Sequence, residues 1–195
     1  MKLKRWIIET LLGYFNIDIT RPFPKQSTKI AKEHFKDKPI VCAEVGVLYG
    51  HNARSILNEL NVKKMYLIDP YKEYKENYNS TLGEVGKTQE QMDKAKKKCE
   101  KYLWFYEDKI VWVNKNSVDA IKDIKEGLDY IYIDANHSYE KVLDDLINYF
   151  SLLNKDGIIA GHDFNILDVA LAVLRFCEDN NLKVQTSEMD WIIKK

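Results

Sequence analysis

Cysteine is scarce in this sequence and shows no metal-binding or disulfide spacing. Only Cys42, Cys99 and Cys177 occur among 195 residues, far apart and odd in number. Disulfide-rich secreted domains and zinc knuckles use paired cysteines at short, regular spacings. The sequence therefore predicts a protein of a reducing compartment, with the cytoplasm as the simplest location.

Glycine, proline and an excess of either charge are also lacking. The chain has 8 glycines and 4 prolines, and 30 basic residues balance 30 acidic ones. Few glycines and prolines argue against collagen-like and linker-rich chains. A net charge of zero argues against a globally basic nucleic-acid clamp, although it leaves room for a local patch. No run of about 18 apolar residues is present that would span a membrane.

A chain of this length predicts one domain. We expect an N-terminal helical extension over residues 1–39 and the main domain over 40–195. Within the extension, residues 3–15 show helical spacing of apolar side chains, and Glu9 interrupts the apolar run that a signal peptide would need. This helix is expected to dock on the domain, or on a second subunit of a homodimer, rather than on a lipid surface.

Short β-branched runs alternate with amphipathic stretches along the rest of the chain. This alternation predicts an α/β fold, a doubly wound Rossmann-like sheet that is mostly parallel, with an antiparallel C-terminal strand and helices on both faces. The expected strands are 40–45, 65–68, 109–113, 129–133, 158–160, 183–186 and 191–194. The expected helices are 52–60, 88–106, 117–125, 139–153 and 166–179.

One segment, at about 70–109, is longer than a plain crossover requires. It is rich in tyrosine and lysine, and the helix expected at its end carries five lysines between residues 94 and 101. A solvated helical face explains such lysines, but long insertions beside the active edge of a sheet also wall substrates. We interpret the segment as a helical insertion and a candidate substrate cap.

Polar residues gather where the expected parallel strands end, the edge at which doubly wound sheets bind ligands. Gly46 and Gly50 would let the chain turn sharply after the first strand. Asp69 ends the next strand, where a carboxylate accepts hydrogen bonds from ribose hydroxyls. Glu44 adds a negative charge where a dinucleotide would need to place its phosphates. S-adenosylmethionine, with an adenosine, an ammonium, a sulfonium and no phosphate, matches these features.

At these residues the sequence resembles the class I S-adenosylmethionine-dependent methyltransferases. A-E-V-G-V-L-Y-G-H-N is similar to their first motif, Y-L-I-D to the second, and N-K-N-S-V-D-A-I to the segment beside adenine. L-D-Y-I-Y-I-D-A-N-H-S-Y and L-L-N-K-D-G-I-I-A-G-H-D-F resemble a branch related to catechol O-methyltransferase and to metal-dependent sugar O-methyltransferases.

The resemblance implies a role for each site residue. The methionine end of the cofactor would contact Glu44, Gly46, Gly50 and Asn52. The ribose would contact Asp69, and the adenine Asn116 and Ser117. Mg²⁺ or Mn²⁺ would bind Asp134, His162 and Asp163. Two departures stand out, because relatives often carry aspartate at position 116 and a carboxylate at position 162.

The implied activity is methyl transfer to a hydroxyl of a small molecule or sugar. Asp134 ends an apolar strand, and a carboxylate there needs a cation or hydrogen-bond donors. His137 is the candidate base, since an imidazole titrates near neutral pH. Simpler roles exist for two of these residues: Asp163 as a helix cap and His137 as a solvated loop residue.

Three other functions are compatible with parts of the pattern. An RNA or protein methyltransferase would use the lysine-rich insertion to dock its substrate, although the charge balance disfavours nucleic acid. A nicotinamide-dependent oxidoreductase would need glycines that are missing. A metal-dependent hydrolase would use Asp134, His137, His162 and Asp163, but leaves the spacing from Gly46 to Asp69 unexplained.

Overall fold

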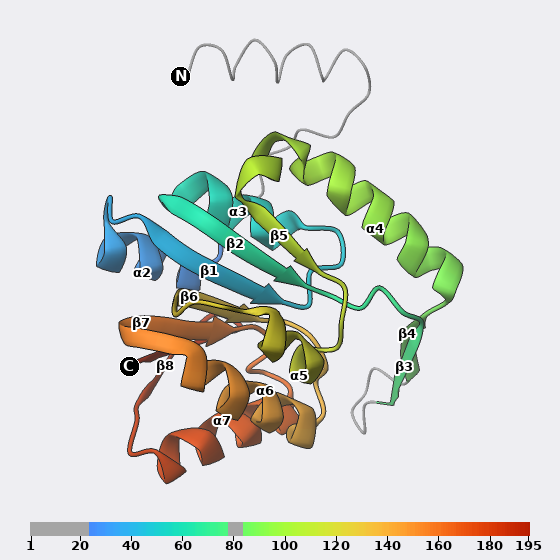
Figure 1. Ribbon diagram of the computed structural model, residues 1–195. Coiled ribbons are helices and arrows are strands. Elements are labelled where there is room, and N and C mark those ends of the chain that lie inside the picture. The colour runs from blue at the N-terminus through green and yellow to red at the C-terminus, as the bar shows by residue number, and fades with distance from the viewer. Residues whose placement is uncertain (1–23, 78–83) are drawn as a thin grey trace.

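The computed structural model describes residues 24–77 and 84–195, and its centre is a seven-stranded sheet (Figure 1). The spatial order is β5-β2-β1-β6-β7-β9-β8. The first five strands in this order pair in parallel, whereas β9 is antiparallel to both of its neighbours. The strands are β1 Ile40–Val45, β2 Val62–Ile68, β5 Ile110–Val113, β6 Leu128–Ile133, β7 Leu153–Gly161, β8 Val184–Ser187 and β9 Asp190–Lys194.

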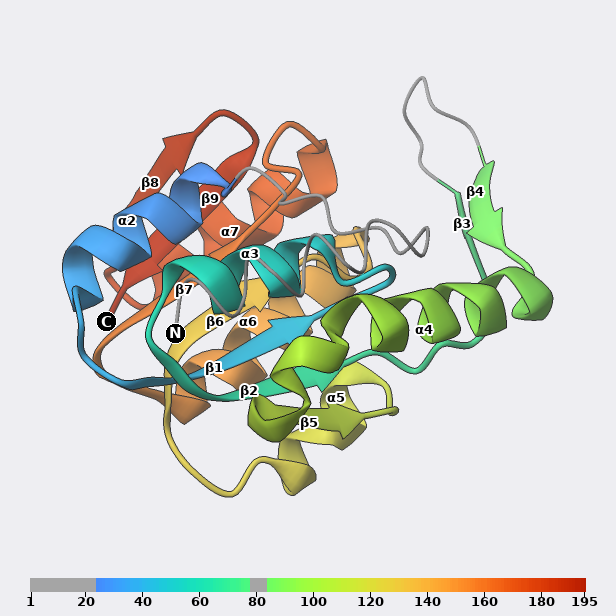
Figure 2. The same cartoon turned by 90° about the horizontal axis from the view of Figure 1, so that it is seen from above.

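Helices cover both faces of the sheet (Figure 2). One face packs against α2 Gln26–Phe35, α3 His51–Glu59 and α4 Gln89–Leu103, and the other against α5 Ser117–Ala120, α6 Tyr139–Leu152 and α7 Leu167–Asp179. Successive strand residues alternate between these two cores, as a pleated strand requires: Cys42 joins the first and Ala43 the second. The expected doubly wound fold with an antiparallel C-terminal strand is confirmed.

The strand order reverses between β1 and β6, because the chain passes from β1 outward to β2 and β5 before it returns to β6 on the other side. Such a reversal leaves a crevice beyond the carboxyl ends of the two strands, between crossovers that lie on opposite faces. The functional residues expected at the strand ends are therefore placed at the edge where this fold class binds ligands.

Several elements differ from the sequence expectations. The helix α2 lies within the expected helical extension 1–39 but was not predicted as a separate element, and the hairpin of β3 Tyr74–Asn77 and β4 Glu84–Lys87 was not expected. The expected helix 88–106 ends earlier as α4 and continues as a 3₁₀ turn over Trp104–Lys109. The expected helix 117–125 is one short α-helical turn, α5, followed by a 3₁₀ turn over Ile121–Asp123. The expected helix 3–15 lies outside the described residues.

The segment expected to be an insertion, of which the structure describes residues 70–77 and 84–109, has two parts with different surroundings. The hairpin projects from one end of the domain (Figure 2). The helix α4 begins with a capping box between Thr88 and Gln91, and it buries Met92, Ala95 and Cys99 in the core beside α3. Because this face is buried, α4 is a structural layer of the domain, and its lysines point outward. Within residues 24–77 and 84–195, no helix combines the length and apolar character needed to cross a bilayer.

Candidate active site

The carboxyl ends of β1, β6 and β7 meet at the reversal of the strand order. The backbone N–H of Asp134, just after β6, donates to the Val45 carbonyl at 2.8 Å, and the N–H of His162, just after β7, donates to the Ile133 carbonyl at 3.2 Å. These bonds extend the parallel pairing past the last strand residues, so that the side chains following β6 and β7 are held beside each other.

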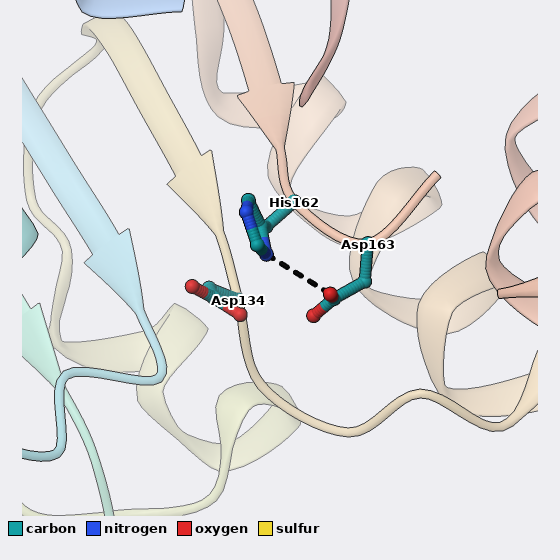
Figure 3. A group of neighbouring side chains, drawn as sticks. All are labelled: Asp134, His162 and Asp163. Carbon is teal, nitrogen blue, oxygen red and sulfur yellow. Dashed lines mark ion pairs between the residues drawn. The ribbon is translucent and has the colours of Figure 1, made fainter. Parts of the chain in front are cut away.

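Three side chains at this edge form a candidate metal centre (Figure 3). Asp134, His162 and Asp163 each offer one ligand atom, and these atoms lie within 4.8 Å of one another. The His162 Nδ1 atom lies 3.0 Å from Asp163 Oδ1. Two carboxylates and one imidazole suit a divalent ion such as Mn²⁺, and oxygen ligands also suit Mg²⁺. The structure thus brings together the three residues that the sequence suggested as ligands.

His137 belongs to the same cluster. Its Nε2 atom lies 2.8 Å from Asp163 Oδ2 and 3.9 Å from Asp134 Oδ1. Burial raises the pKa of Asp163, but hydrogen bonds from His137 and His162 outweigh it and hold this pKa below its ordinary value. The hydrogen bond to Asp163 raises the pKa of His162. His137 is therefore a fixed member of the site, not a solvated loop residue.

Asp163 does not cap the following helix. The N-cap of α7 is Ile166, and Asp163 contributes only its backbone carbonyl, which accepts a bond from the N–H of Ile166 at 2.8 Å. Its φ of +59° lies in the left-handed region, which an aspartate tolerates better than most residues. This backbone conformation accompanies a side chain turned toward the two histidines.

Lys25 is a site residue that the sequence analysis missed. It immediately precedes α2, and its Nζ atom lies 3.2 Å from Asp134 Oδ2 and 2.6 Å from the hydroxyl oxygen of Tyr132. Sequence spacing gives no signal for this contact, because Lys25 and Asp134 are 109 positions apart. The ammonium group supplies the cation that a carboxylate at the end of an apolar strand was expected to need.

Glu44 and Asn52 form a second polar group, on β1 and α3. Glu44 is buried, and its Oε1 atom accepts a hydrogen bond of 2.9 Å from Asn52 Nδ2. Burial raises the pKa of Glu44 to about 8, against the lowering effect of the Asn52 bond, and the charge of Asp134 raises it further. Within residues 24–77 and 84–195, Glu44 Oε2 and Asn52 Oδ1 are buried acceptors without a hydrogen-bond partner. Two orphaned acceptors in one place fit a ligand that brings N–H donors, such as the ammonium of S-adenosylmethionine.

The two glycines of the first motif are required by packing. Gly46 has a φ of +85°, and a Cβ atom on it would lie 2.1 Å from the carbonyl oxygen of Asp134. Gly50, at the start of α3, has a φ of +75°, and its Cβ would lie 2.6 Å from Cys99 Sγ in α4. Packing within the protein alone therefore explains why both positions are glycine. Their contact with a cofactor stays a prediction.

Asp69 organises the loop between β1 and α3. Its Oδ2 atom accepts hydrogen bonds from the backbone N–H groups of Val47 at 3.0 Å and Leu48 at 2.9 Å, and its Oδ1 atom accepts one from Tyr71 at 2.8 Å. A carboxylate has about four lone-pair sites, so one remains for a ribose hydroxyl. The structural role of Asp69 thus leaves room for the predicted ribose contact, which stays a prediction.

The predicted adenine contacts follow β5, on the far side of β2 from the candidate metal centre. Asn116 is exposed at the N-cap of α5 and makes no side-chain capping bond, and Ser117 is half-buried. The neighbouring Asn114 donates from Nδ2 to the Asp69 carbonyl at 3.2 Å. This segment therefore lies next to Asp69, as adenine and ribose contacts must, and away from Asp134.

Comparison with known proteins shows the family of this domain and its fold. A family described as a methyltransferase domain matches residues 43–164. No curated protein sequence matches the chain significantly. The fold is similar to that of a Staphylococcus aureus protein proposed to be a caffeoyl-CoA O-methyltransferase, with 12% identity, 100% of each chain covered and a TM-score of 0.62.

Two further solved structures show the same fold. An O-methyltransferase from Bacillus cereus in complex with S-adenosylhomocysteine (SAH) has 12% identity, covers 95% of this chain and 88% of its own, and gives a TM-score of 0.61. A protein from Clostridium thermocellum proposed to be an rRNA methylase has 14% identity, covers 89% of this chain and 99% of its own, and gives 0.60. The family match covers more than half of the chain, which therefore belongs to the methyltransferase domain family as a class I S-adenosylmethionine-dependent methyltransferase.

Proposed function

We propose that this enzyme methylates a hydroxyl of a small molecule, with a divalent metal ion assisting. The observation that carries the proposal is the cluster of Asp134, His162 and Asp163, with His137 hydrogen-bonded at its rim. A methyltransferase acting on a hydroxyl needs a means of removing its proton and of holding its oxygen in line with the methyl group. This cluster supplies candidates for both tasks.

The proposed roles follow from the chemistry of each group. Mg²⁺ or Mn²⁺, bound by Asp134, His162 and Asp163, would lower the pKa of an acceptor hydroxyl. His137 accepts the hydroxyl proton as the acceptor oxygen bonds to the methyl carbon and the carbon–sulfur bond breaks, leaving SAH. Asp163 orients the His137 ring through the 2.8 Å bond and stabilises the imidazolium that forms.

On the cofactor side, Glu44 and Asn52 are proposed to bind the methionine ammonium through their orphaned acceptors. Gly46 and Gly50 shape the adjoining loop. Asp69 would accept a ribose hydroxyl, and Asn116 with Ser117 would face the adenine. The residues proposed to bind the cofactor follow the edge of the sheet between β6 and β5, and those for the methionine end are nearest the candidate metal centre.

Calorimetry separates the cofactor and metal parts of the proposal. We expect SAH to bind the wild type with and without Mn²⁺, and Mn²⁺ to bind at least tenfold more weakly to Asp134→Ala, because a cluster of three ligands loses one carboxylate. Asp144→Ala, which removes an exposed carboxylate of α6, is the matched control and should bind Mn²⁺ like the wild type. Equal Mn²⁺ binding by Asp134→Ala would contradict the metal part, and absence of SAH binding would contradict the cofactor part.

Docking of RNA or protein on α4 is the second candidate, and the exposed lysines followed by exposed Trp104 and Phe105 favour it. Against it, Lys94 and Lys96 pair with Glu90 and Glu100 of the same helix. We therefore expect weak RNA binding, with a binding constant whose logarithm falls only slightly as the logarithm of the salt concentration rises. A steep slope, corresponding to several neutralised phosphates in a fluorescence anisotropy titration, would favour the RNA substrate instead.

A further inference from the structure

Lys25 places an ammonium group beside the proposed metal centre. Its Nζ atom contacts Asp134 Oδ2 at 3.2 Å and lies 4.7 Å from the centroid of the Tyr132 ring. The side chains of Lys25 and Asp134 are only 26% and 29% exposed, so water screens the pair incompletely. Lys25 precedes residues 43–164, the part of the chain that matches the family. The contact is therefore contributed from outside the matched domain.

Buried hydrogen bonds hold Lys25 in this place. The Tyr132 hydroxyl donates a hydrogen bond to Asp190 Oδ1 at 3.0 Å. Because its proton points to Asp190, the lone pairs of the Tyr132 oxygen face the Lys25 ammonium, which donates to this oxygen at 2.6 Å. The other Asp190 oxygen accepts bonds from the backbone N–H of Ser27 at 3.1 Å and from its hydroxyl at 2.6 Å. Ser27, Tyr132 and Asp190 are all buried. The start of α2 is thus fixed to β6 and β9, and Lys25 is not an ordinary surface lysine.

Each carboxylate of the candidate metal centre already has a partner from the protein. Asp163 is hydrogen-bonded to His137 and lies beside His162, and Asp134 is paired with Lys25. A divalent ion would need an oxygen of Asp134 and would then lie next to the ammonium group. Two positive charges on one half-buried carboxylate repel each other more strongly than they would in bulk water.

We propose that Lys25 and the divalent ion are alternative cations for Asp134, so that Lys25 lowers the metal affinity of the site and metal binding displaces its ammonium group. This inference rests on the metal site of the proposed function. It assigns Lys25 the role of a positioning residue that neutralises Asp134 when no metal is bound.

Mn²⁺ binding to charge variants of the full chain tests the proposal, with calorimetry and the electron paramagnetic resonance signal of free Mn²⁺ as readouts. We expect Lys25→Met to bind Mn²⁺ about tenfold more tightly than the wild type, since it removes one positive charge next to Asp134. Lys25→Gln keeps a polar group for Tyr132 and should show the same gain, which guards against misfolding of the methionine variant. Lys25→Arg, which keeps the charge, and Lys29→Met, which removes an exposed lysine of α2, should bind like the wild type.

The outcomes separate this inference from the proposed function. Unchanged or weaker Mn²⁺ binding by folded Lys25→Met and Lys25→Gln would overturn the role of Lys25 and leave the metal site standing. Absence of Mn²⁺ binding in every variant would overturn both the role of Lys25 and the metal assistance. SAH titrations of the same samples report on the cofactor site independently, so methyltransferase function is judged apart from either result.

Discussion

At pH 8, replacement of Glu44 by glutamine is expected to raise the free energy of unfolding by about 3–5 kcal/mol. Burial raises the pKa of Glu44 from 4.5 to about 8 in the folded chain. The folded state therefore holds the proton more tightly than the unfolded state does. The stability linked to this proton is fully present below pH 4.5 and is lost as the pH rises to about 8. Glutamine cannot ionise, so the variant avoids the loss.

Urea unfolding of both proteins at several pH values measures this effect. The difference in unfolding free energy should be near zero at pH 4.5 and grow steadily toward pH 8, because the other titrating groups cancel in the comparison. Glu33→Gln, at an exposed position of α2, is the control and should stay within about 0.5 kcal/mol of the wild type throughout. A difference for Glu44→Gln that does not change with pH would contradict the raised pKa.

The same substitution should weaken cofactor binding. An ammonium ligand favours the ionised form of Glu44, so SAH binding to the wild type at pH 7 is expected to release a proton and to tighten as the pH approaches 8. Calorimetry in buffers of different ionisation enthalpy counts that proton, and Glu44→Gln should release none. A carboxylate that costs stability when ionised and gains binding energy from a cation is typical of a functional site.

The sheet could be predicted because its central strands have a sequence pattern that is typical of buried strands. Tyr130–Ile133 is a continuous apolar run that is buried on both faces, as central parallel strands are. By contrast, α2 buries Ser27 and Thr28 with its apolar residues, so its sequence shows a weak helical pattern. The hairpin of β3 and β4 is rich in residues that suit exposed loops. The position of α2 depends on tertiary contacts such as those of Ser27 with Asp190, which the local sequence does not encode.

The convergence of the candidate metal ligands could be predicted from topology, whereas their role as ligands was implied by the family resemblance. Parallel strands deliver the residues after their carboxyl ends to one edge, so Asp134, His162 and Asp163 meet there once the strand order is known. Lys25 follows no such rule. Its position depends on Asp190, near the other end of the chain, which holds Ser27 and Tyr132. A side chain placed by a buried network of this kind becomes visible only in three dimensions.

Gly46→Ala is expected to destabilise the protein by about 3–5 kcal/mol, since two penalties act together. The φ of +85° is unfavourable for any residue with a Cβ atom, and this atom would lie 2.1 Å from the carbonyl oxygen and 2.5 Å from the carbonyl carbon of Asp134. Both clashing atoms are backbone, so no change of rotamer relieves the overlap. The end of β6 must move away from β1, which breaks the 2.8 Å bond from the Asp134 N–H to the Val45 carbonyl.

Gly127→Ala is the matched control for this substitution. Its Cβ would lie even closer to another atom, 1.9 Å, but this atom is Oδ1 of the Asn154 side chain, which can rotate away. We expect guanidinium unfolding to show that Gly127→Ala lowers the free energy of unfolding by about 1 kcal/mol. Any Gly46→Ala protein that folds should also bind Mn²⁺ more weakly than the wild type, because Asp134 moves with β6. Equal losses for the two variants would show that the backbone of Asp134 yields easily. In that case Gly46 would not be the residue that keeps the cofactor loop and the metal ligand Asp134 correctly placed relative to each other.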